Sequence, residues 1–201
     1  MLVCENLSCV RGERKIFSYL GFCLQEGSIL LLKGANGSGK TSLIKIIAGL
    51  HSSETGKILW NGKPSKDNNE FKRELAYIGH KSGVKNDASV YENLEFWAKI
   101  YGTEILLPAA LKYFDLGKFA DLPAGQLSAG WQRRVALARL IIAPCRLWLL
   151  DEPTNFLDEE AVILTASLIE SRVQQGGIVI SASHIMSSSF PTHNLQMADF
   201  S

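Results

Sequence analysis

The most informative segment of this chain is Gly34-Ala35-Asn36-Gly37-Ser38-Gly39-Lys40-Thr41. It follows the apolar run Ile29-Leu30-Leu31-Leu32 and precedes a helical pattern over residues 42–49. A strand, a glycine-rich loop and a helix in this order are the context of a phosphate-binding loop. Glycines let backbone N–H groups converge on an anion, and the helix directs its positive dipole end at the same point.

The loop also supplies a charge and a hydroxyl group. Lys40 adds a positive charge for the β- and γ-phosphates, and the hydroxyl of Thr41 can bind Mg²⁺. We therefore expect this loop to hold a nucleotide together with its magnesium ion. The residues expected to contact the nucleotide are Gly34, Ala35, Asn36, Gly37, Ser38, Gly39, Lys40, Thr41 and Ser42.

Composition limits the class of protein. The chain has 201 residues, 46% apolar and 20% charged, so a substantial core is expected, and we predict one domain over residues 1–201. The net charge of +1 gives no electrostatic reason to expect a nucleic-acid partner. The four cysteines form no CxxC pair, which favours reduced thiols in a cytosolic setting. We expect neither a secretory signal nor a run of the ~18–20 apolar residues that span a bilayer, so a membrane function would need another chain.

Apolar runs and turn residues predict strands on both sides of the loop and helices between them. Strands are expected at 2–4, 16–17, 22–24, 29–33, 57–60, 75–78, 147–150 and 178–181, with turns at 11–13, 26–27 and 61–62. Helices are expected at 42–49, 90–101, 108–116, 129–143 and 159–172. Residues 63–72 read as a polar loop, and the tail from Met186 is polar and weakly patterned.

Residues from about 87 to 143 are expected to form a helical subdomain inserted in the α/β core. Its first helix opens with a capping box at Ser89-Val90-Tyr91-Glu92 and carries a partly aromatic face. That face suits either internal packing or docking of another subunit. Its last helix begins after Ser128, with an apolar face of Val135, Ala138, Ile141 and Ile142 and an expected polar face of Arg133, Arg134 and Arg139.

Four apolar strands each end in polar residues that bear on chemistry. These are the phosphate-binding loop, His80, the pair Asp151-Glu152, and His184. In a parallel sheet the carboxyl ends of strands meet at one edge, where ligands bind. The sequence therefore predicts a phosphate cradle, two carboxylates and two imidazoles around one nucleotide.

At this point the chain resembles the ATP-binding subunits of ABC transporters over nearly its whole length. The motifs occur in the family's order, as Walker A (34–41), signature (Leu127-Ser128-Ala129-Gly130), Walker B (147–152), D-loop (155–158) and switch histidine (His184). The resemblance implies the P-loop ABC-ATPase core, a mixed sheet with central parallel strands, an antiparallel N-terminal part and a helical subdomain.

The resemblance also implies roles for single residues. Lys40 and the loop amides bind phosphates, and Thr41 ligates Mg²⁺ with Asp151 holding the ion through water. Glu152 polarises the attacking water and His184 contacts the γ-phosphate, which makes Lys40, Glu152 and His184 the expected catalytic set. Phosphoryl transfer depends mainly on such positioning and charge stabilisation.

A second half-site is implied at the signature. Ser128 and Gly130 lie at a helix N-terminus, which is itself suited to anions. In the family this half-site faces the ATP bound by a second chain, so a homodimer that encloses two ATP molecules is expected.

Three positions depart from the common form of the family. His80 stands where most relatives carry a glutamine that senses Mg²⁺ and the membrane partner, so His80 is expected at the metal site with Thr41 and Asp151. Trp131 follows the signature where glutamine is usual. Arg11 lies near the place where an aromatic residue stacks on adenine. A guanidinium plane also stacks on a base, so Arg11 remains a candidate nucleotide contact.

Within the family, the chain resembles the ATPase subunits of the cytochrome c maturation system, often called the haem exporter. The similarity rests on Ile58-Leu59-Trp60-Asn61-Gly62, on His80, and on residues 127–140, which read LSAGWQRRVALARL. It implies a peripheral subunit on the cytoplasmic face of the bacterial inner membrane, held by an integral-membrane, CcmB-like subunit. No Cys-Pro or CxxCH string occurs, so direct haem contact is not expected.

Other functions stay open, and the first alternative is the ATPase subunit of another ABC transporter. The unusual His80 and Trp131 motivate a nucleotide-gated binding module with little hydrolysis. A soluble ABC protein acting on ribosomes or DNA would be expected to carry tandem ATPase domains or long coiled-coil inserts, and this chain has neither. A P-loop kinase is the weakest alternative, because it would not need the Ser128 signature.

Overall fold

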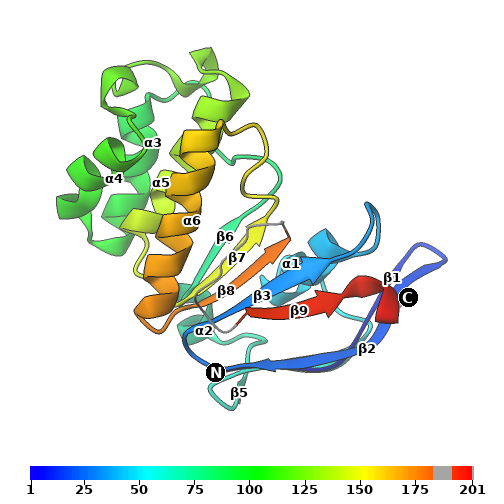
Figure 1. The fold of residues 1–201 in the computed structure, drawn as a ribbon. Coiled ribbons are helices and arrows are strands. Elements are labelled where there is room, and N and C mark those ends of the chain that lie inside the picture. Colours follow the sequence, from blue (N-terminus) through cyan, green and yellow to red (C-terminus); the bar gives the residue numbers. More distant parts are fainter. Residues whose placement is uncertain (183–191, 201) are drawn as a thin grey trace.

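Two β-sheets form the framework of the molecule in the computed structural model, which describes residues 1–182 and 192–200 (Figure 1). The smaller sheet has four antiparallel strands in the order β2-β1-β4-β5. The larger sheet has five parallel strands in the order β6-β7-β8-β3-β9. The predicted mixed α/β fold, with an antiparallel N-terminal part and central parallel strands, is confirmed.

The antiparallel sheet comes from two hairpins near the start of the chain. The first joins β1 (Leu2–Arg11) to β2 (Arg14–Leu24), and the second joins β4 (Thr55–Trp60) to β5 (Lys63–Pro64). Asn61 and Gly62, at the second turn, both have positive φ, 50° and 78°, as a tight hairpin turn requires. The turns predicted at 11–13 and 61–62 are confirmed. The strands are longer than their predicted apolar segments, because main-chain pairing continues through polar residues.

The parallel sheet carries the phosphate-binding loop. Its strands are β3 (Ser28–Lys33), β6 (Leu75–Ile78), β7 (Leu147–Asp151), β8 (Ile178–Ala182) and β9 (Thr192–Gln196). The first four were predicted, whereas no strand was predicted for residues 192–196 in the polar, weakly patterned tail. Strand β9 pairs with the main chain of β3, and Leu195 is its buried residue, so backbone pairing forms this strand with little help from hydrophobicity.

The core lies on both faces of the parallel sheet. Leu30 and Leu32 of β3 face a cluster shared with the antiparallel sheet and α1 (Lys40–Ile47). Ile29 and Leu31 face a second cluster shared with the helices. This alternation follows from the two-residue period of a strand. Because both faces of β3 are covered, its apolar segment 29–32 has no polar face.

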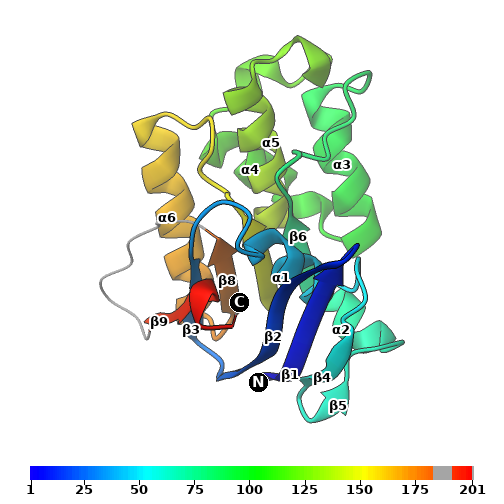
Figure 2. The same ribbon diagram turned by 90° about the vertical axis from the view of Figure 1, so that its right-hand side faces the viewer.

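Apart from α1, which packs in the cluster shared with the antiparallel sheet, four helices gather on the side of the parallel sheet away from β1 and β2 (Figures 1 and 2). They are α3 (Val90–Tyr101), α4 (Leu107–Tyr113), α5 (Ala129–Ile142) and α6 (Glu159–Gln174), with 3-10 turns at Glu104–Leu106, Gly117–Phe119, Ala124–Gln126 and Met197–Phe200. The predicted capping box is confirmed, since Ser89 Oγ accepts from Glu92 N at 3.1 Å and Glu92 Oε2 accepts from Ser89 N at 2.7 Å. The division into one domain with a helical subdomain stays a prediction. Within residues 1–182 and 192–200, none of the helices is long and apolar enough to cross a bilayer.

Residues 63–72, predicted as a polar loop, contain the end strand β5 and the short helix α2 (Asn69–Arg73). Asn68 caps the helix by accepting from Phe71 N at 3.1 Å. Phe71 is buried, and its ring lies 5.8 Å from that of Trp60. One buried aromatic ring anchors a single helical turn here, and a single apolar residue leaves no periodicity for sequence reasoning to detect.

The expected polar face of α5 is also wrong. Arg133 and Arg134 are each only 3% exposed, and Arg139 is half-buried with its guanidinium 4.7 Å from the ring centre of Trp97. Buried arginines need partners for their donors, and these partners come from loops distant in the sequence. Periodicity alone therefore assigned these side chains to the wrong environment.

Candidate functional site

The polar residues that end three strands lie together at one edge of the parallel sheet, as predicted. Thr41, just inside α1, donates from Oγ1 to Asp151 Oδ1 at 3.0 Å, although strand β8 separates β3 from β7. Nδ1 of His80, after β6, lies 3.4 Å from Glu152 Oε2. His184 follows β8 but lies outside the described residues, so its expected position beside the phosphates stays a prediction.

The phosphate-binding loop folds back on its own lysine. Gly37 and Gly39 have φ of 81° and 101°, and a Cβ on Gly39 would lie 2.6 Å from the side chain of Ile16. Lys40 Nζ donates to the carbonyl oxygens of Gly34, at 2.6 Å, and Ala35, at 3.0 Å. Because these bonds hold the ammonium group over the loop, it faces the space where an anion would meet the N-terminus of α1.

A cleft of about 240 Å³ opens over this loop and adjoins a second of about 450 Å³. Residues common to both linings are Asn36, Lys40 and Glu152. Arg11 and Ile16 line the smaller cleft beside the loop, which is where the sequence predicted a contact with the base. Arg11 Nη2 lies 3.1 Å from Nδ1 of His51, a residue that belongs to none of the sequence motifs.

The Thr41–Asp151 contact fits a divalent cation that arrives with a nucleotide. Asp151 is 1% exposed, and its Oδ2 is buried without a hydrogen-bond partner. Burial raises the pKa of this carboxyl, while the Thr41 hydrogen bond acts in the opposite direction. The described residues contain no cluster of three or more His, Cys, Asp or Glu that could hold a metal ion. The hydroxyl of Thr41 beside the carboxylate of Asp151 suits Mg²⁺, which commonly takes one or two protein ligands and completes its shell with phosphates and water.

Glu152 is held in an uncommon backbone conformation. Its φ is 50°, in the left-handed region that non-glycine residues adopt only where the surroundings hold them. Asn155 Nδ2 donates to Glu152 Oε2 at 2.5 Å, the same oxygen that faces His80. The sequence analysis names Asn155 only within the D-loop and does not predict this contact. The available signal was the spacing of three residues between Glu152 and Asn155.

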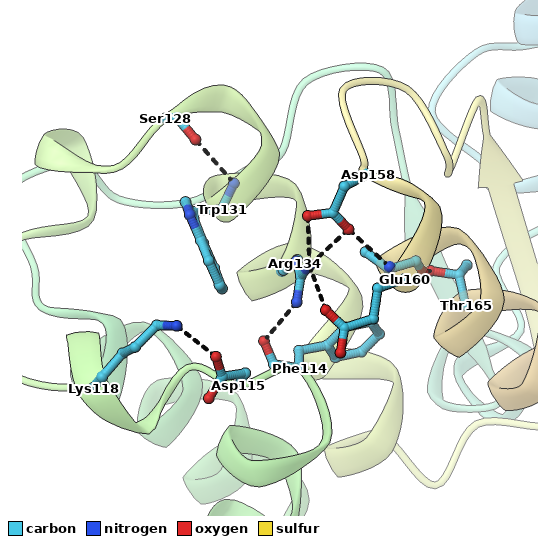
Figure 3. A network of polar contacts seen from close by, with 10 residues as sticks. Phe114, Asp115, Lys118, Ser128, Trp131, Arg134, Asp158, Glu160 and Thr165 are labelled. Carbon is cyan, nitrogen blue, oxygen red and sulfur yellow. Dashed lines mark hydrogen bonds and ion pairs between the residues drawn. The ribbon is translucent and has the colours of Figure 1, made fainter.

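The signature residues form a separate cleft of about 370 Å³ at the N-terminus of α5 (Figure 3). Ser128 caps this helix by accepting from Trp131 N at 3.5 Å. A Cβ on Gly130 would lie 2.5 Å from the carbonyl oxygen of Phe156, so only glycine allows this close approach. The cleft shares no lining residue with the two around the phosphate-binding loop. Within one chain, the fold does not bring Ser128 and Gly130 to Lys40.

Trp131, which lines the signature cleft, has two cationic side chains beside its ring. The guanidinium of Arg134 lies 4.4 Å from its ring centre, Lys118 Nζ lies 4.9 Å away, and Phe119 packs edge-on at 4.7 Å. Arg134 also donates to both carboxylate oxygens of Asp158 at 2.7 Å (Figure 3). The backbone N–H of Ala161 and then Arg134 lower the pKa of Asp158. The tryptophan that replaces the usual glutamine is therefore built into a packed cluster.

Comparison with known proteins agrees with this geometry. The family described as "ABC transporter" matches residues 17–155, which is more than half of the chain. The chain belongs to the ABC transporter family. It is an ABC ATPase, a subunit that binds and hydrolyses ATP, and this assignment bears out the prediction made from the order of its motifs.

Relatives and solved structures give the same result for this ABC ATPase. It is 41% identical over 187 residues to the "Cytochrome c biogenesis ATP-binding export protein CcmA" of Aliivibrio fischeri, covering 92% of each chain. A putative ABC transporter ATP-binding protein from Pyrococcus furiosus matches with a TM-score of 0.85 and 26% identity, covering 100% of this chain and 98% of that one. The ATP-binding cassette MJ0796, a dimer in a post-hydrolysis state bound to ADP and Pi, matches in fold with a TM-score of 0.80 and 22% identity, covering 92% and 88%.

Proposed function

We propose that this ABC ATPase hydrolyses Mg²⁺-ATP to drive an integral-membrane partner in cytochrome c biogenesis, as a homodimer that closes over two ATP molecules. The observation that carries the proposal is the presence of two unlike half-sites on one chain. One is the loop around Lys40 with Asp151 and Glu152, and the other is the cleft around Ser128 and Gly130. Neither half encloses a nucleotide alone.

The roles follow from the chemistry of phosphoryl transfer. Loop amides and Lys40 bind the phosphates, and Thr41 and Asp151 hold the magnesium ion, which neutralises charge on the phosphates. Glu152, steadied by Asn155, accepts a hydrogen bond from the attacking water and orients it. His184 is proposed to contact the γ-phosphate. His80 belongs to the same site through Glu152 and reports on the magnesium-bound state.

Head-to-tail pairing completes each site. The signature cleft of one chain would face the phosphates held by its partner, and the N-terminus of α5 would direct its free N–H groups at them. Phe156 is 69% exposed beside this cleft, which suits a surface that becomes covered in a dimer. The related cassette MJ0796 forms a dimer in its post-hydrolysis state.

The membrane partner is proposed to dock at a groove of about 480 Å³ between α3 and the end of β6. Trp97, Tyr101 and Gly79 line it, and Ile100 of the same helix is 57% exposed. Gly79 precedes His80 directly, so a protein docked in this groove would be able to alter the contact between His80 and Glu152. We propose an integral-membrane, CcmB-like occupant on the cytoplasmic face of the bacterial inner membrane. Haem would then be handled by that partner, without contact to this chain.

One experiment tests the catalytic part of the proposal. The chain is co-purified from membranes with its bound integral protein, and Mg²⁺-dependent phosphate release is measured for the parent and for Glu152→Gln. The variant should bind ATP normally and turn over roughly 10²-fold slower or worse, because a main transition-state contact is lost. Glu70→Gln, at a surface ion pair with Lys63, is the matched control and should keep parental turnover. Equal turnover in Glu152→Gln would refute the role given to Glu152.

A second candidate is a nucleotide-gated binding module with little hydrolysis. It is favoured by one observation, that His80 lies 3.4 Å from the carboxylate proposed to orient water. Single-turnover measurements on the complex separate the two functions. Tight ATP binding with negligible phosphate release over many binding lifetimes would favour the module.

A further inference from the structure

Arg133 is buried beneath the proposed catalytic site and donates to four backbone carbonyl oxygens. Nε donates to Pro153 at 3.0 Å, and Nη1 donates to Gly79 at 2.6 Å. Nη2 donates both to Asp151, at 2.9 Å, and to Glu152, at 2.7 Å. One guanidinium thus binds the carbonyls of the last residue of β7 and the two residues that follow it, and the carbonyl of the residue just before His80.

Arg133 is 3% exposed, so burying its charged guanidinium costs desolvation free energy. In the part of the chain that the structure describes, Arg133 forms no ion pair, so carbonyl dipoles alone contact its charge. Burial lowers the pKa of Arg133, while the charges of Asp151 and Glu152 oppose that shift. A planar fork with five N–H donors on three nitrogens can satisfy four carbonyls from two separate segments at once, whereas lysine has three donors on one nitrogen and glutamine has two.

Two of the carbonyls that Arg133 binds belong to Asp151 and Glu152, where the backbone adopts an uncommon conformation. Glu152 has φ of 50°, and a strained conformation persists only where neighbouring contacts over-determine it. Asp151 and Glu152 are successive residues, so a shift of this backbone would move both the proposed magnesium ligand and the proposed water-orienting group. On the other side, holding Gly79 fixes the start of the loop that presents His80 to Glu152.

Arg133 also connects the two half-sites of the chain. It lies on α5, the helix whose N-terminus carries Ser128 and Gly130, and its head group reaches the carboxyl end of β7. The neighbouring Arg134 has a different target, Asp158. Arg133 does not line either cleft around Lys40, so it acts through other residues and does not touch the nucleotide.

We propose that Arg133 is a positioning residue for ATP hydrolysis, which fixes the Asp151–Pro153 backbone and the Gly79–His80 loop relative to the signature helix. The proposal rests on the proposed function, because it assigns Arg133 to the reaction of that site. It predicts an effect on turnover without a matching effect on ATP affinity, since none of the hydrogen bonds that Arg133 donates among the described residues goes to the phosphate-binding loop.

The test compares the parent with Arg133→Gln, Arg133→Lys and the control Arg172→Met. Arg172 is a half-buried arginine on α6 whose guanidinium lies 4.8 Å from the ring centre of Trp148, away from the proposed site. Two readouts are taken on the complex with its membrane partner: kcat and KM for ATP, and amide hydrogen exchange of the purified complex without nucleotide. Exchange needs no turnover, so it reports on Arg133 even if the parent fails to hydrolyse ATP.

Arg133→Gln should lower kcat about tenfold or more while KM for ATP stays within about threefold, because misplaced catalytic groups cost rate more than binding. Peptides covering 76–82 and 150–156 should exchange faster, while peptides of β1 and β2 keep parental exchange. Arg133→Lys, which keeps the charge and part of the bonding, should recover an intermediate kcat. Arg172→Met should match the parent in kcat.

Two results would overturn the proposal. One is parental kcat and local exchange in Arg133→Gln. The other is faster exchange across the whole chain with kcat reduced only in proportion to the folded fraction, which would make Arg133 a general support of the fold. Absence of hydrolysis in the parent would refute the proposed function, and the local exchange pattern would still decide whether Arg133 holds these two segments.

Discussion

The contact between Thr41 and Asp151 is the best place to perturb the site, because one hydroxyl supports a buried carboxylate. Thr41→Val keeps the shape of the side chain and removes the donor to Asp151 Oδ1. Oδ2 of this carboxylate already lacks a partner, so the variant leaves both oxygens of a residue that is 1% exposed without a side-chain donor. We expect the nucleotide-free protein to be less stable as a result.

The size of the effect follows from the burial of the carboxylate. Leaving a buried acceptor unsatisfied costs about 1–3 kcal/mol, which corresponds to a fall of about 2–12 °C in Tm for a chain of this length. Burial already raises the pKa of Asp151 in the folded state above its ordinary value. Ionisation of Asp151 therefore lowers the free energy of unfolding as pH rises above the ordinary pKa of an aspartate. Losing the Thr41 donor enlarges this loss of stability, because the ionised carboxylate then lacks its hydrogen bond. The stability difference between variant and parent should therefore grow as pH rises above the ordinary pKa of an aspartate carboxyl.

Thermal unfolding of both proteins at several pH values, without nucleotide, measures this difference. Thr165→Val is the matched control, because Thr165 is also buried but its hydroxyl donates at 2.7 Å to the carbonyl of Ala161 within α6. That carbonyl lies one helical turn back and keeps its main-chain donor, so the control should cost under about 1 kcal/mol at every pH. A Thr41→Val variant as stable as the parent, or a loss that does not grow with pH, would refute the reasoning.

Three further changes test other parts of the structure. Asn155→Ala frees the Glu152 carboxylate and should lower kcat about tenfold with KM for ATP little changed, as steady-state kinetics would measure; an unchanged kcat would contradict the positioning of Glu152 by Asn155. Gly130→Ala places a methyl group against the carbonyl of Phe156 and should weaken ATP-dependent dimerisation, measured by light scattering, while parental dimerisation would show that this close approach is dispensable. Ser89→Ala removes the cap of α3 and should cost about 1 kcal/mol in thermal unfolding, with no loss contradicting the cap.

Local features of the structure were largely predictable from neighbouring residues. The glycine-rich loop, the hairpin turn at Asn61-Gly62 and the cap at Ser89 all depend on φ preferences or on side chains within three residues of their targets. The ends of apolar strands also located Asp151 and Glu152, because strand direction in a parallel sheet fixes the edge where these residues meet.

The missed features depend on distant partners. Arg133 and Arg134 were assigned to a solvent face, since nothing near them in the sequence reveals the carbonyls and carboxylate that receive their donors. Strand β9 was missed because it is formed by pairing with β3, more than 150 positions earlier in the chain. Neither kind of contact leaves a periodic trace in the residues that make it.

The class of this protein can be read from its motifs, because the phosphate-binding loop, signature and acidic strand end are short segments whose chemistry is local. The way in which these segments support one another becomes visible in the folded molecule. Thr41 meets Asp151 and Arg133 reaches Gly79 across gaps of 110 and 54 residues, and the signature cleft lies apart from the loop that it complements. Such relations arise when sheet and helices close on a shared core, since packing fixes distances between residues that covalent connection leaves free.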